Sequence, residues 1–256
     1  MTNVISIANE KGGVAKTTTT LSLGGALVEA GYRVLVIDLD PQANLSLSLG
    51  VKPGEKCISV VNLMLSDLPL TEGIKTTEIE NLHLIPSNHE VGLAERLLPS
   101  RSGFEFLLKD MLSNLNGNYD FILIDCPPFL GAITQNALIA SDFLILPTQA
   151  EYFSVYALRN MMSLIRQVRS KGNSKLRYRL LITMFDKRNG IHRTLADHLR
   201  TTFNNGVLDS VIEVDTKLRE SPIICRPVVY HAAKSRSALQ YRFLAQEIIQ
   251  YVQENN

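Results

Sequence analysis

The sequence has few cysteines and no long apolar run, and each of these shortages excludes a class of protein. Its three cysteines, Cys57, Cys126 and Cys225, are odd in number and far apart, so neither a disulfide framework nor a zinc-ligand spacing is visible. No apolar run reaches the length that spans a bilayer, and the N-terminus lacks the basic and apolar regions of a signal peptide. We therefore expect a soluble cytoplasmic protein.

Linkers and internal repeats are also lacking. No segment of the 256 residues has the composition that would separate two domains, and a chain of this length fits one large α/β domain. Hydrophobic residues make up 45% and charged residues 20%, a balance that excludes wholesale disorder. We therefore expect a single domain over residues 1–256.

The net charge of +1 conceals an uneven distribution. Residues 1–150 carry nine Lys and Arg against 16 Asp and Glu, whereas residues 151–256 carry 17 against nine. This asymmetry predicts a basic face built from the C-terminal part of the chain. Scattered, solvated surface charges are the alternative.

Patterns of buried strands alternate with helical patterns along the chain. This alternation predicts a doubly wound, mostly parallel β-sheet flanked by helices. Residues 41–80 contain proline and glycine between short apolar pieces, and we expect helical turns and loops there, packed over the ligand end of the sheet. The predicted strands are a run before residue 9, 34–37, 81–88, 121–124, 143–150, 178–186 and 210–214, and the predicted helices are 17–30, 102–115, 154–170, 190–203 and 237–252.

One stretch, ISIANEKGGVAKTTTTLSL, passes from a β-branched run through a Gly-Gly loop into a helical pattern. In this order of elements, backbone N–H groups and a helix N-terminus converge on an anion. Gly12 and Gly13 let the backbone approach a phosphate without a Cβ in between. Lys16 supplies an ammonium group for the β- and γ-phosphates, and Thr17 supplies a hydroxyl for the Mg²⁺ that bridges them.

Acidic residues follow two of the predicted buried strands. Asp38 and Asp40 end the run 34–37, and Asp125 ends the run 121–124. Doubly wound sheets place their ligands at this carboxyl edge, and carboxylates two residues apart on a strand project to the same face. Asp125 stands where a carboxylate would hold the magnesium shell. For Asp38 and Asp40, a pair of turn residues is the alternative interpretation.

The generic phosphate-loop pattern G-x-x-x-x-G-K-[ST] is not met, because Glu10 and Ala15 occupy its glycine positions. The loop instead reads K-G-G-x-x-K-[ST] with Lys11 in front, and this form resembles the ParA/MinD family of P-loop ATPases. The segments TMFDKRN, LRESPI and SRSALQYRFLAQEI resemble later blocks of that family, so the resemblance covers nearly the whole chain. Ala15 departs from the family's usual glycine.

The resemblance implies an ATPase that uses ATP and Mg²⁺ and closes into an ATP-dependent homodimer, in which Lys11 reaches the partner's phosphates. It assigns Asp40 to the attacking water and Asp38 to support of the metal and the loop lysine. It also implies that the loop after the 183–186 strand and the segment around 217–222 flank the adenine and the dimer edge. The implied catalytic residues are Lys11, Lys16 and Asp40; the implied metal residues are Thr17, Asp38 and Asp125; the implied nucleotide contacts are Lys11, Gly12, Gly13, Val14, Ala15, Lys16, Thr17, Thr18 and Met184.

Two branches of the family differ at the C-terminus. A membrane-binding branch ends in a basic amphipathic helix, but this chain has no Lys or Arg after Arg242, so we expect a docked helix and no membrane contact. The ParA branch binds DNA non-specifically, lies on the nucleoid and is stimulated by a ParB-like or other adaptor. Because no helix-turn-helix precedes the first predicted strand, we do not expect a repressor that reads an operator sequence. The candidate DNA contacts are Arg188, Arg193, Lys217, Arg219, Lys234, Arg236 and Arg242.

Two other functions stay open on the sequence. A metabolic P-loop enzyme, related to the nitrogenase iron protein, dethiobiotin synthetase or a cobyrinate amidase, would use the same loop. An iron protein needs cluster cysteines at the dimer edge, and only Cys126 lies near the predicted site. A MinD-like membrane ATPase is the second alternative. The cargo, whether plasmid, chromosome or a large assembly such as the carboxysome, is not encoded in any motif of this chain.

Overall fold

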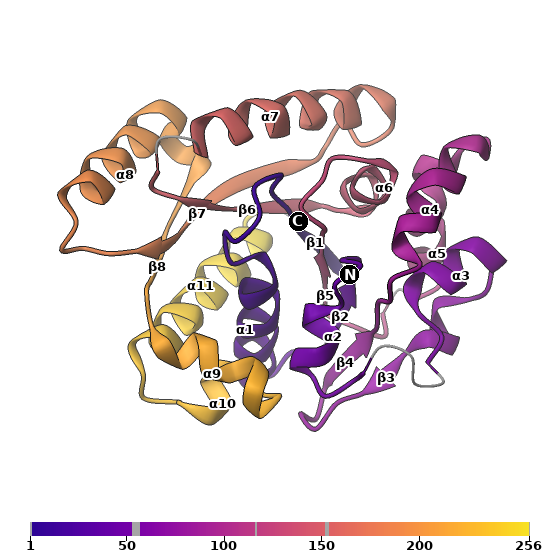
Figure 1. Ribbon diagram of the computed structural model, residues 1–256, viewed down its shortest axis with the longest axis horizontal. Helices are drawn as coiled ribbons and strands as arrows, with labels where there is room; N and C mark the ends of the chain where they lie inside the picture. Colours follow the sequence, from indigo (N-terminus) through magenta and orange to yellow (C-terminus); the bar gives the residue numbers. More distant parts are fainter. Residues whose placement is uncertain (1, 53–56, 116, 152–153, 256) are drawn as a thin grey trace.

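One eight-stranded sheet forms the centre of the computed structural model, which describes residues 2–52, 57–115, 117–151 and 154–255 (Figure 1). The strand order is β3-β4-β2-β5-β1-β6-β7-β8, and among the described residues only the β3 and β4 pair is antiparallel. The predicted doubly wound, mostly parallel sheet is confirmed. The strands are β1 Asn3–Ile7, β2 Val34–Asp38, β3 Lys75–Thr76, β4 Leu82–Ile85, β5 Phe121–Asp125, β6 Phe143–Gln149, β7 Arg177–Phe185 and β8 Val207–Glu213.

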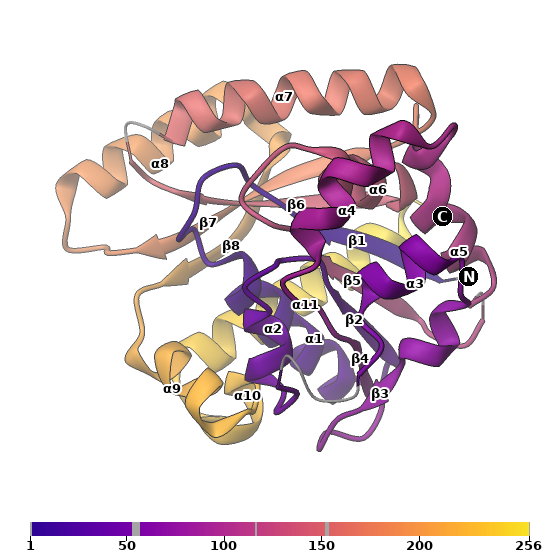
Figure 2. The same ribbon diagram turned by 45° about the vertical axis from the view of Figure 1, so that its right-hand side comes forward.

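Helices cover both faces of this sheet (Figures 1 and 2). Helices α1, α2, α10 and α11 pack into one apolar cluster, and α3 to α8 pack into the other. No helix in the described ranges is long and apolar enough to cross a membrane. The helices are α1 Lys16–Glu29, α2 Asn44–Ser48, α3 Val60–Ser66, α4 Val91–Leu97, α5 Leu107–Ser113, α6 Ala132–Ala140, α7 Ser154–Lys171, α8 Gly190–Phe203, α9 Thr216–Ile224, α10 Val228–His231 and α11 Arg236–Gln253, with 3₁₀ turns at Leu70–Gly73, Leu98–Ser100, Phe104–Phe106 and Asn204–Gly206.

The central strands are apolar throughout because helices cover both of their faces. All five residues of β2 and all five of β5 are buried. Val34 and Val36 face the α1 and α11 layer, whereas Leu35 and Ile37 face the α4 to α7 layer. This alternation explains why a parallel strand reads as a continuous apolar run.

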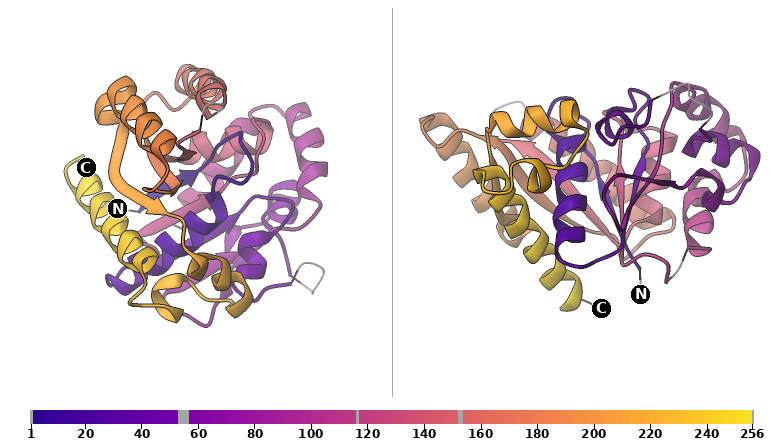
Figure 3. Two further views of the ribbon diagram at one scale, coloured as in Figure 1. Left: turned by 60° about the vertical axis from the view of Figure 1, so that its left-hand side comes forward. Right: turned by 90° about the horizontal axis from the view of Figure 1, so that it is seen from below.

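The register of the central strands gathers the acidic residues at one edge. Asp38 of β2 is aligned with Asp125 of β5, and Asp125 is aligned with Ile7 of β1. The loop from β1 to α1 leaves the sheet at this same edge, while both chain ends lie at the opposite edge (Figure 3). The predicted phosphate loop and the predicted carboxylates are therefore neighbours.

Several boundaries differ from the sequence-based expectations. The helix predicted over 102–115 is wrong at its start, because Gly103 adopts a left-handed conformation with φ of +71° and a 3₁₀ turn precedes α5. The strand predicted at 210–214 begins earlier, at Val207. In 41–80, α2 lies at the ligand end as expected, but α3 packs in the other layer; residues 53–56 lie outside the described ranges. The helices α4, α6, α9 and α10 were not predicted.

Candidate nucleotide-binding site

The loop between β1 and α1 contains two left-handed residues. Gly13 has φ of +73°, and Ala15, the N-cap of α1, has φ of +67°. Glycine adopts this conformation freely, whereas an alanine there costs on the order of 1–2 kcal/mol. The Ala15 carbonyl still accepts a hydrogen bond from Thr19 N (2.9 Å), so the first helical turn closes normally. The strained residue places the positive end of α1 at the edge of the sheet.

Lys16 is the buried cation of the site. Lys16 is the first residue of α1, and its Nζ donates a hydrogen bond to the Lys11 carbonyl oxygen at 3.3 Å. Burial lowers the pKa of Lys16, and the charges of Asp125 and Asp40 act in the opposite direction. The ammonium group is therefore held in place before any ligand arrives.

Asp125 sits at the base of the site and is fully buried. Its carboxylate accepts hydrogen bonds from Thr17 Oγ1 (2.7 Å) and Thr20 Oγ1 (3.3 Å). Burial raises the pKa of Asp125 well above its ordinary value, and the neighbouring Asp38 raises it further. The threonine predicted to hold magnesium and the carboxylate predicted to hold it are thus in direct contact.

Asp38 lies deeper than the sequence suggested. It is fully buried, and its carboxylate accepts hydrogen bonds from Ser46 N (2.9 Å), Ser46 Oγ (2.7 Å) and Asp40 N (3.1 Å). Burial raises the pKa of Asp38 to about 6. Asp38 therefore positions α2 and the backbone of Asp40, and the structure does not place it on the pocket wall.

The oxygen ligands at this edge suit a magnesium ion. Three carboxyl groups lie near one buried ammonium group, that of Lys16. They belong to Asp38, Asp40 and Asp125, and the charges of Asp40 and Asp125 interact with Lys16. Within the described ranges no three His, Cys, Asp or Glu side chains converge as a metal cage. Mg²⁺ ordinarily needs only one or two protein oxygens, because phosphates and water complete its shell. Thr17 and Asp125 meet that requirement.

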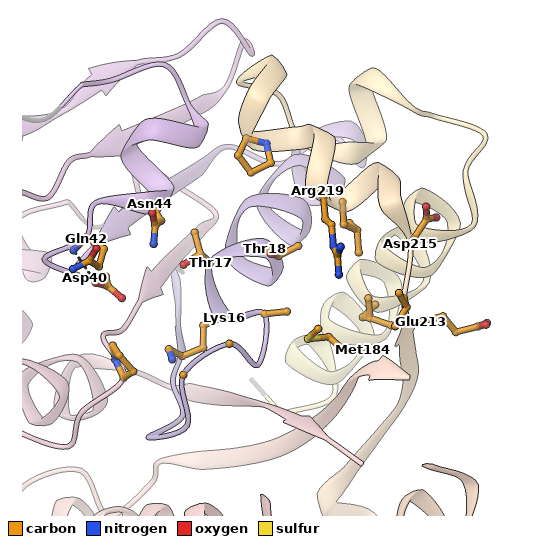
Figure 4. A pocket seen from close by; sticks show the side chains of 18 residues that line it. Lys16, Thr17, Thr18, Asp40, Gln42, Asn44, Met184, Glu213, Asp215 and Arg219 are labelled. Atoms are coloured by element: carbon orange, nitrogen blue, oxygen red, sulfur yellow. Dashed lines mark hydrogen bonds between the residues drawn. The ribbon is translucent and has the colours of Figure 1, made fainter. Parts of the chain in front are cut away.

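A pocket of about 610 Å³ opens above these groups (Figure 4). Asp40, Gln42 and Asn44 stand on one side, and Met184, Glu213 and Arg219 stand on the other, with Lys16 and Thr17 between them. This volume lies in the range of pockets that hold small-molecule ligands. Its lining consists of Gly12, Gly13, Ala15, Lys16, Thr17, Thr18, Asp40, Gln42, Asn44, Pro128, Met184, Ile212, Glu213, Val214, Asp215, Leu218, Arg219 and Pro222.

Comparison with known proteins agrees with this geometry. The family model described as an AAA domain matches residues 2–178. The sporulation initiation inhibitor protein Soj of Bacillus subtilis is 36% identical over 97% of this chain and 98% of its own, and the chromosome partitioning protein ParA of Caulobacter vibrioides is 35% identical over 96% and 93%. The chain belongs to the ParA family of P-loop ATPases.

A solved structure shows how closely the fold of this ParA-family chain is shared. A Mycobacterium smegmatis protein named cobyrinic acid a,c-diamide synthase, with a bound ATP analogue and magnesium, superimposes with a TM-score of 0.88. It is 33% identical and covers 100% of this chain and 98% of its own. The fold and the phosphate loop are therefore those of a nucleotide-binding protein.

Lys11, the lysine in front of the two glycines, does not line the pocket of its own chain. Its Nζ donates to Gln149 Oε1 at 3.0 Å and pairs with Glu151 Oε2 at 2.5 Å, and the side chain is 26% exposed. Val14 is buried, and its carbonyl accepts a hydrogen bond from Thr183 Oγ1. The other predicted nucleotide contacts lie on the pocket wall.

Most of the basic residues that the sequence assigned to DNA contact other groups of this ParA-family chain. Arg219 lines the nucleotide pocket, and Arg193 Nη1 donates to the Lys187 carbonyl at 2.6 Å. Lys234 lines a separate hollow beside α11. The remaining four pair with carboxylates of the same chain: Arg188 with Asp186, Lys217 with Glu220, Arg236 with Glu213 and Arg242 with Glu29.

Some pocket residues were not assigned from the sequence. Gln42 and Asn44 follow the Asp-Pro turn. The other unassigned stretch is 212–215, which runs from the end of β8 to the residue before α9. From the sequence, only the family resemblance of Met184 and of the 217–222 segment pointed toward this wall. Gln149, which contacts Lys11 and donates to Met184 Sδ, carries no sequence signal of its own.

A pair of substitutions tests the strain in the loop. Replacing Ala15 with glycine removes about 1–2 kcal/mol of left-handed strain from the folded state. It also lowers stability by about 0.4–1 kcal/mol, because glycine gives the unfolded chain more conformational entropy. We expect Ala15→Gly to raise the free energy of unfolding of the ligand-free protein by roughly 0.5 kcal/mol, measured by urea denaturation. Gly13→Ala should lower it, although a methyl group on Gly13 would meet no atom within 4 Å. Equal effects of the two changes would contradict the assignment of strain to Ala15.

The buried carboxylates give a pH-dependent prediction. The folded pKa of Asp38 is raised from its ordinary 3.8 to about 6, and that of Asp125 is raised too, so the folded state without ligand binds protons more tightly than the unfolded state. Their contribution to stability is therefore greatest at low pH and is lost as the pH rises through about 6.

We expect Asp125→Asn, measured in EDTA without nucleotide, to unfold at higher urea than the wild type at pH 8 and to lose this advantage progressively as the pH falls toward the ordinary aspartate pKa of 3.8. Asp197→Asn, an exposed carboxylate on α8, is the control and should show no such trend. A wild-type protein that is equally or more stable than Asp125→Asn at pH 8 would show that the buried charge is not a cost.

Proposed function

We propose that this chain binds Mg²⁺-ATP, closes into a homodimer, binds DNA without sequence preference, and hydrolyses ATP when an adaptor stimulates it, so that a cargo is segregated or positioned. The observation that carries the proposal is that Thr17, at the start of α1, donates a hydrogen bond to the buried Asp125 while the phosphate loop and Asp40 line one pocket. Membership of the ParA family supports it, because relatives of almost equal length are named for chromosome partitioning. Residues 1–256 then act as a single unit.

In this mechanism the protein positions charge. Lys16 and the N–H groups of the loop and of the first turn of α1 offset the phosphate charge. Thr17 and Asp125 would hold Mg²⁺, which when bound shields the phosphate oxygens during transfer. Asp40, on the pocket wall, orients the attacking water. Met184 and Leu218 supply apolar surface to the base.

Two substitutions separate binding from hydrolysis. Lys16→Ala removes the buried ammonium group and should abolish detectable ATP binding. Asp40→Ala should still bind ATP, but its turnover should fall by about 10²-fold or more, the usual loss when a positioned acid or base is removed. Equilibrium binding of a fluorescent ATP analogue and phosphate release measure the two effects. Normal turnover in Asp40→Ala would contradict the role given to Asp40.

Dimerisation requires Lys11 to exchange partners. In the single chain Lys11 is engaged by Gln149 and Glu151 (Nζ to Oε2, 2.5 Å), so reaching the phosphates of a second copy means leaving the Glu151 carboxylate. Both side chains are partly exposed, and an ion pair of this kind contributes about 0.2–1 kcal/mol. The Glu151 pair thus opposes closure weakly.

Glu151→Gln should therefore tighten the ATP-dependent dimer about two- to thirtyfold, since two such pairs break per dimer and about 1.4 kcal/mol corresponds to a tenfold change. Sedimentation equilibrium with a slowly hydrolysed ATP analogue measures the dissociation constant. Glu254→Gln, which changes an exposed carboxylate at the end of α11, serves as the control. A weaker dimer in Glu151→Gln would mean that Glu151 supports the closed state instead.

A second candidate function follows from the name of the M. smegmatis structure, cobyrinic acid a,c-diamide synthase. Amide transfer from glutamine commonly uses a reactive thiolate. Cys126, which directly follows Asp125, is fully buried, and burial raises its pKa, which keeps the thiol protonated and unreactive. ATP turnover that depends on DNA and an adaptor supports the first function, whereas turnover that depends on cobyrinic acid and glutamine supports the second.

A further inference from the structure

One carboxylate on the wall of the nucleotide pocket also contacts two basic side chains. Glu213 is the last residue of β8, and it lines the pocket together with its neighbours in 212–215 (Figure 4). Its side chain is only 16% exposed. Glu213 Oε2 accepts a hydrogen bond from Arg236 Nη1 at 2.9 Å and lies 3.7 Å from Lys187 Nζ. Glu213 Oε1 accepts a hydrogen bond from Gln240 Nε2 at 3.1 Å.

These three partners come from two segments that are far apart in the sequence. Lys187 belongs to the loop after β7, whereas Arg236 is the first residue of α11 and Gln240 lies one turn further along that helix. None of the three lines the nucleotide pocket. Glu213 therefore connects the pocket wall to two basic segments that lie outside the pocket.

The backbone around Glu213 is held as firmly as its side chain. Glu213 N donates to Gln240 Oε1 at 3.0 Å, so Gln240 bonds both the main chain and the carboxylate of this residue. Val214 N donates to the Phe185 carbonyl at 3.1 Å, and Arg236 Nη2 donates to the Val214 carbonyl at 2.7 Å. These contacts keep the negative charge beside both cations.

Both cations lie among the residues that the sequence assigned to DNA. Lys187 directly precedes Arg188, and Arg236 follows Lys234 by two positions. The Lys187 side chain is 65% exposed and that of Arg236 is 46% exposed, so a phosphate group can approach either one. The phosphate would compete with the Glu213 carboxylate for the same positive charge. Since phosphate contacts supply most of the affinity of non-specific DNA binding, this competition weakens it.

We propose that Glu213 is a positioning residue that neutralises Lys187 and Arg236 in the chain without ATP, and so restrains their contact with DNA phosphates. The proposal rests on the DNA binding included in the proposed function, and it names the residue that opposes this binding. A nucleotide that contacts the wall 212–215 acts on the strand end that carries this carboxylate. The restraint is therefore weaker when ATP is bound.

Glu213→Gln tests the restraint, because it removes the charge and keeps a side-chain oxygen for Gln240 Nε2. Binding of a fluorescent non-specific duplex is measured over a series of salt concentrations, without nucleotide and with a saturating, slowly hydrolysed ATP analogue and Mg²⁺. Without nucleotide the variant should bind about tenfold more tightly than the wild type at low salt. The slope of log K against log salt should steepen by up to about 1.8, at about 0.9 for each released cation. With the analogue the gain should be less than threefold.

Glu105→Gln is the matched control. It removes the same charge from a carboxylate that is 18% exposed and is paired with Lys171, on α7. This variant should change DNA affinity less than threefold with or without the analogue.

Two further variants separate neutralisation from a structural role of Glu213. Adding Lys187→Gln to Glu213→Gln should reverse about half of the gain in slope, because one of the two released cations is then absent. Should Glu213→Gln fail to fold, Glu213→Asp keeps the charge but withdraws it from both cations by one methylene. Glu213→Asp should then give a smaller gain in DNA affinity in the same direction.

The possible failures are distinguishable. If the wild type binds DNA with the analogue but Glu213→Gln matches the Glu105→Gln control without nucleotide, the restraint is wrong and the proposed function stands. Weaker DNA binding by Glu213→Gln would show that Glu213 supports the DNA surface, and an equal gain with and without nucleotide would refute its link to the pocket. If the wild type binds no DNA under any condition, the proposed function fails and this proposal fails with it.

Discussion

Unbalanced buried charge at the carboxyl edge of the sheet is the constraint on which the rest of the structure depends. Asp38 and Asp125 are aligned on neighbouring strands, both are fully buried, and burial raises the pKa of each. Lys16 is the buried cation beside them. A protein that needed only stability would replace such a group with apolar residues. The cost is understandable if a ligand brings the missing positive charge.

The fold supplies this edge with rigid support. Helices on both faces bury β2 and β5 completely, so the carboxylates at their ends have little freedom to move toward water. Thr17 and Thr20 hold Asp125 from α1, and Ser46 holds Asp38 from α2. The strained Ala15 starts α1 at the position that these contacts require. The exposed pair of Lys11 and Glu151 is the looser part of the site, which suits a group that must change partners.

Much of this architecture could be predicted from the sequence, because continuous apolar runs ending in Asp38 and Asp125 indicate buried parallel strands with acidic ends. The Gly-Gly loop and the Lys16-Thr17 pair are also local signals. What could not be predicted depended on contacts that exist only in the folded chain: Asp38 is hydrogen-bonded to Ser46, and Arg219 lines the pocket. Some of the basic residues proposed to contact DNA pair with carboxylates that are far away in the sequence. Arg242, for example, pairs with Glu29, which is 213 residues away.

The most direct test of the central claim is the magnesium dependence of ATP binding. ATP alone adds negative charge to an edge where three carboxylates already outnumber one buried ammonium group. Isothermal titration of the wild type with a slowly hydrolysed ATP analogue, in Mg²⁺ and then in EDTA, should give tight binding only with the metal. An affinity in EDTA equal to that in Mg²⁺ would contradict the account, because it would show that the site needs no added positive charge.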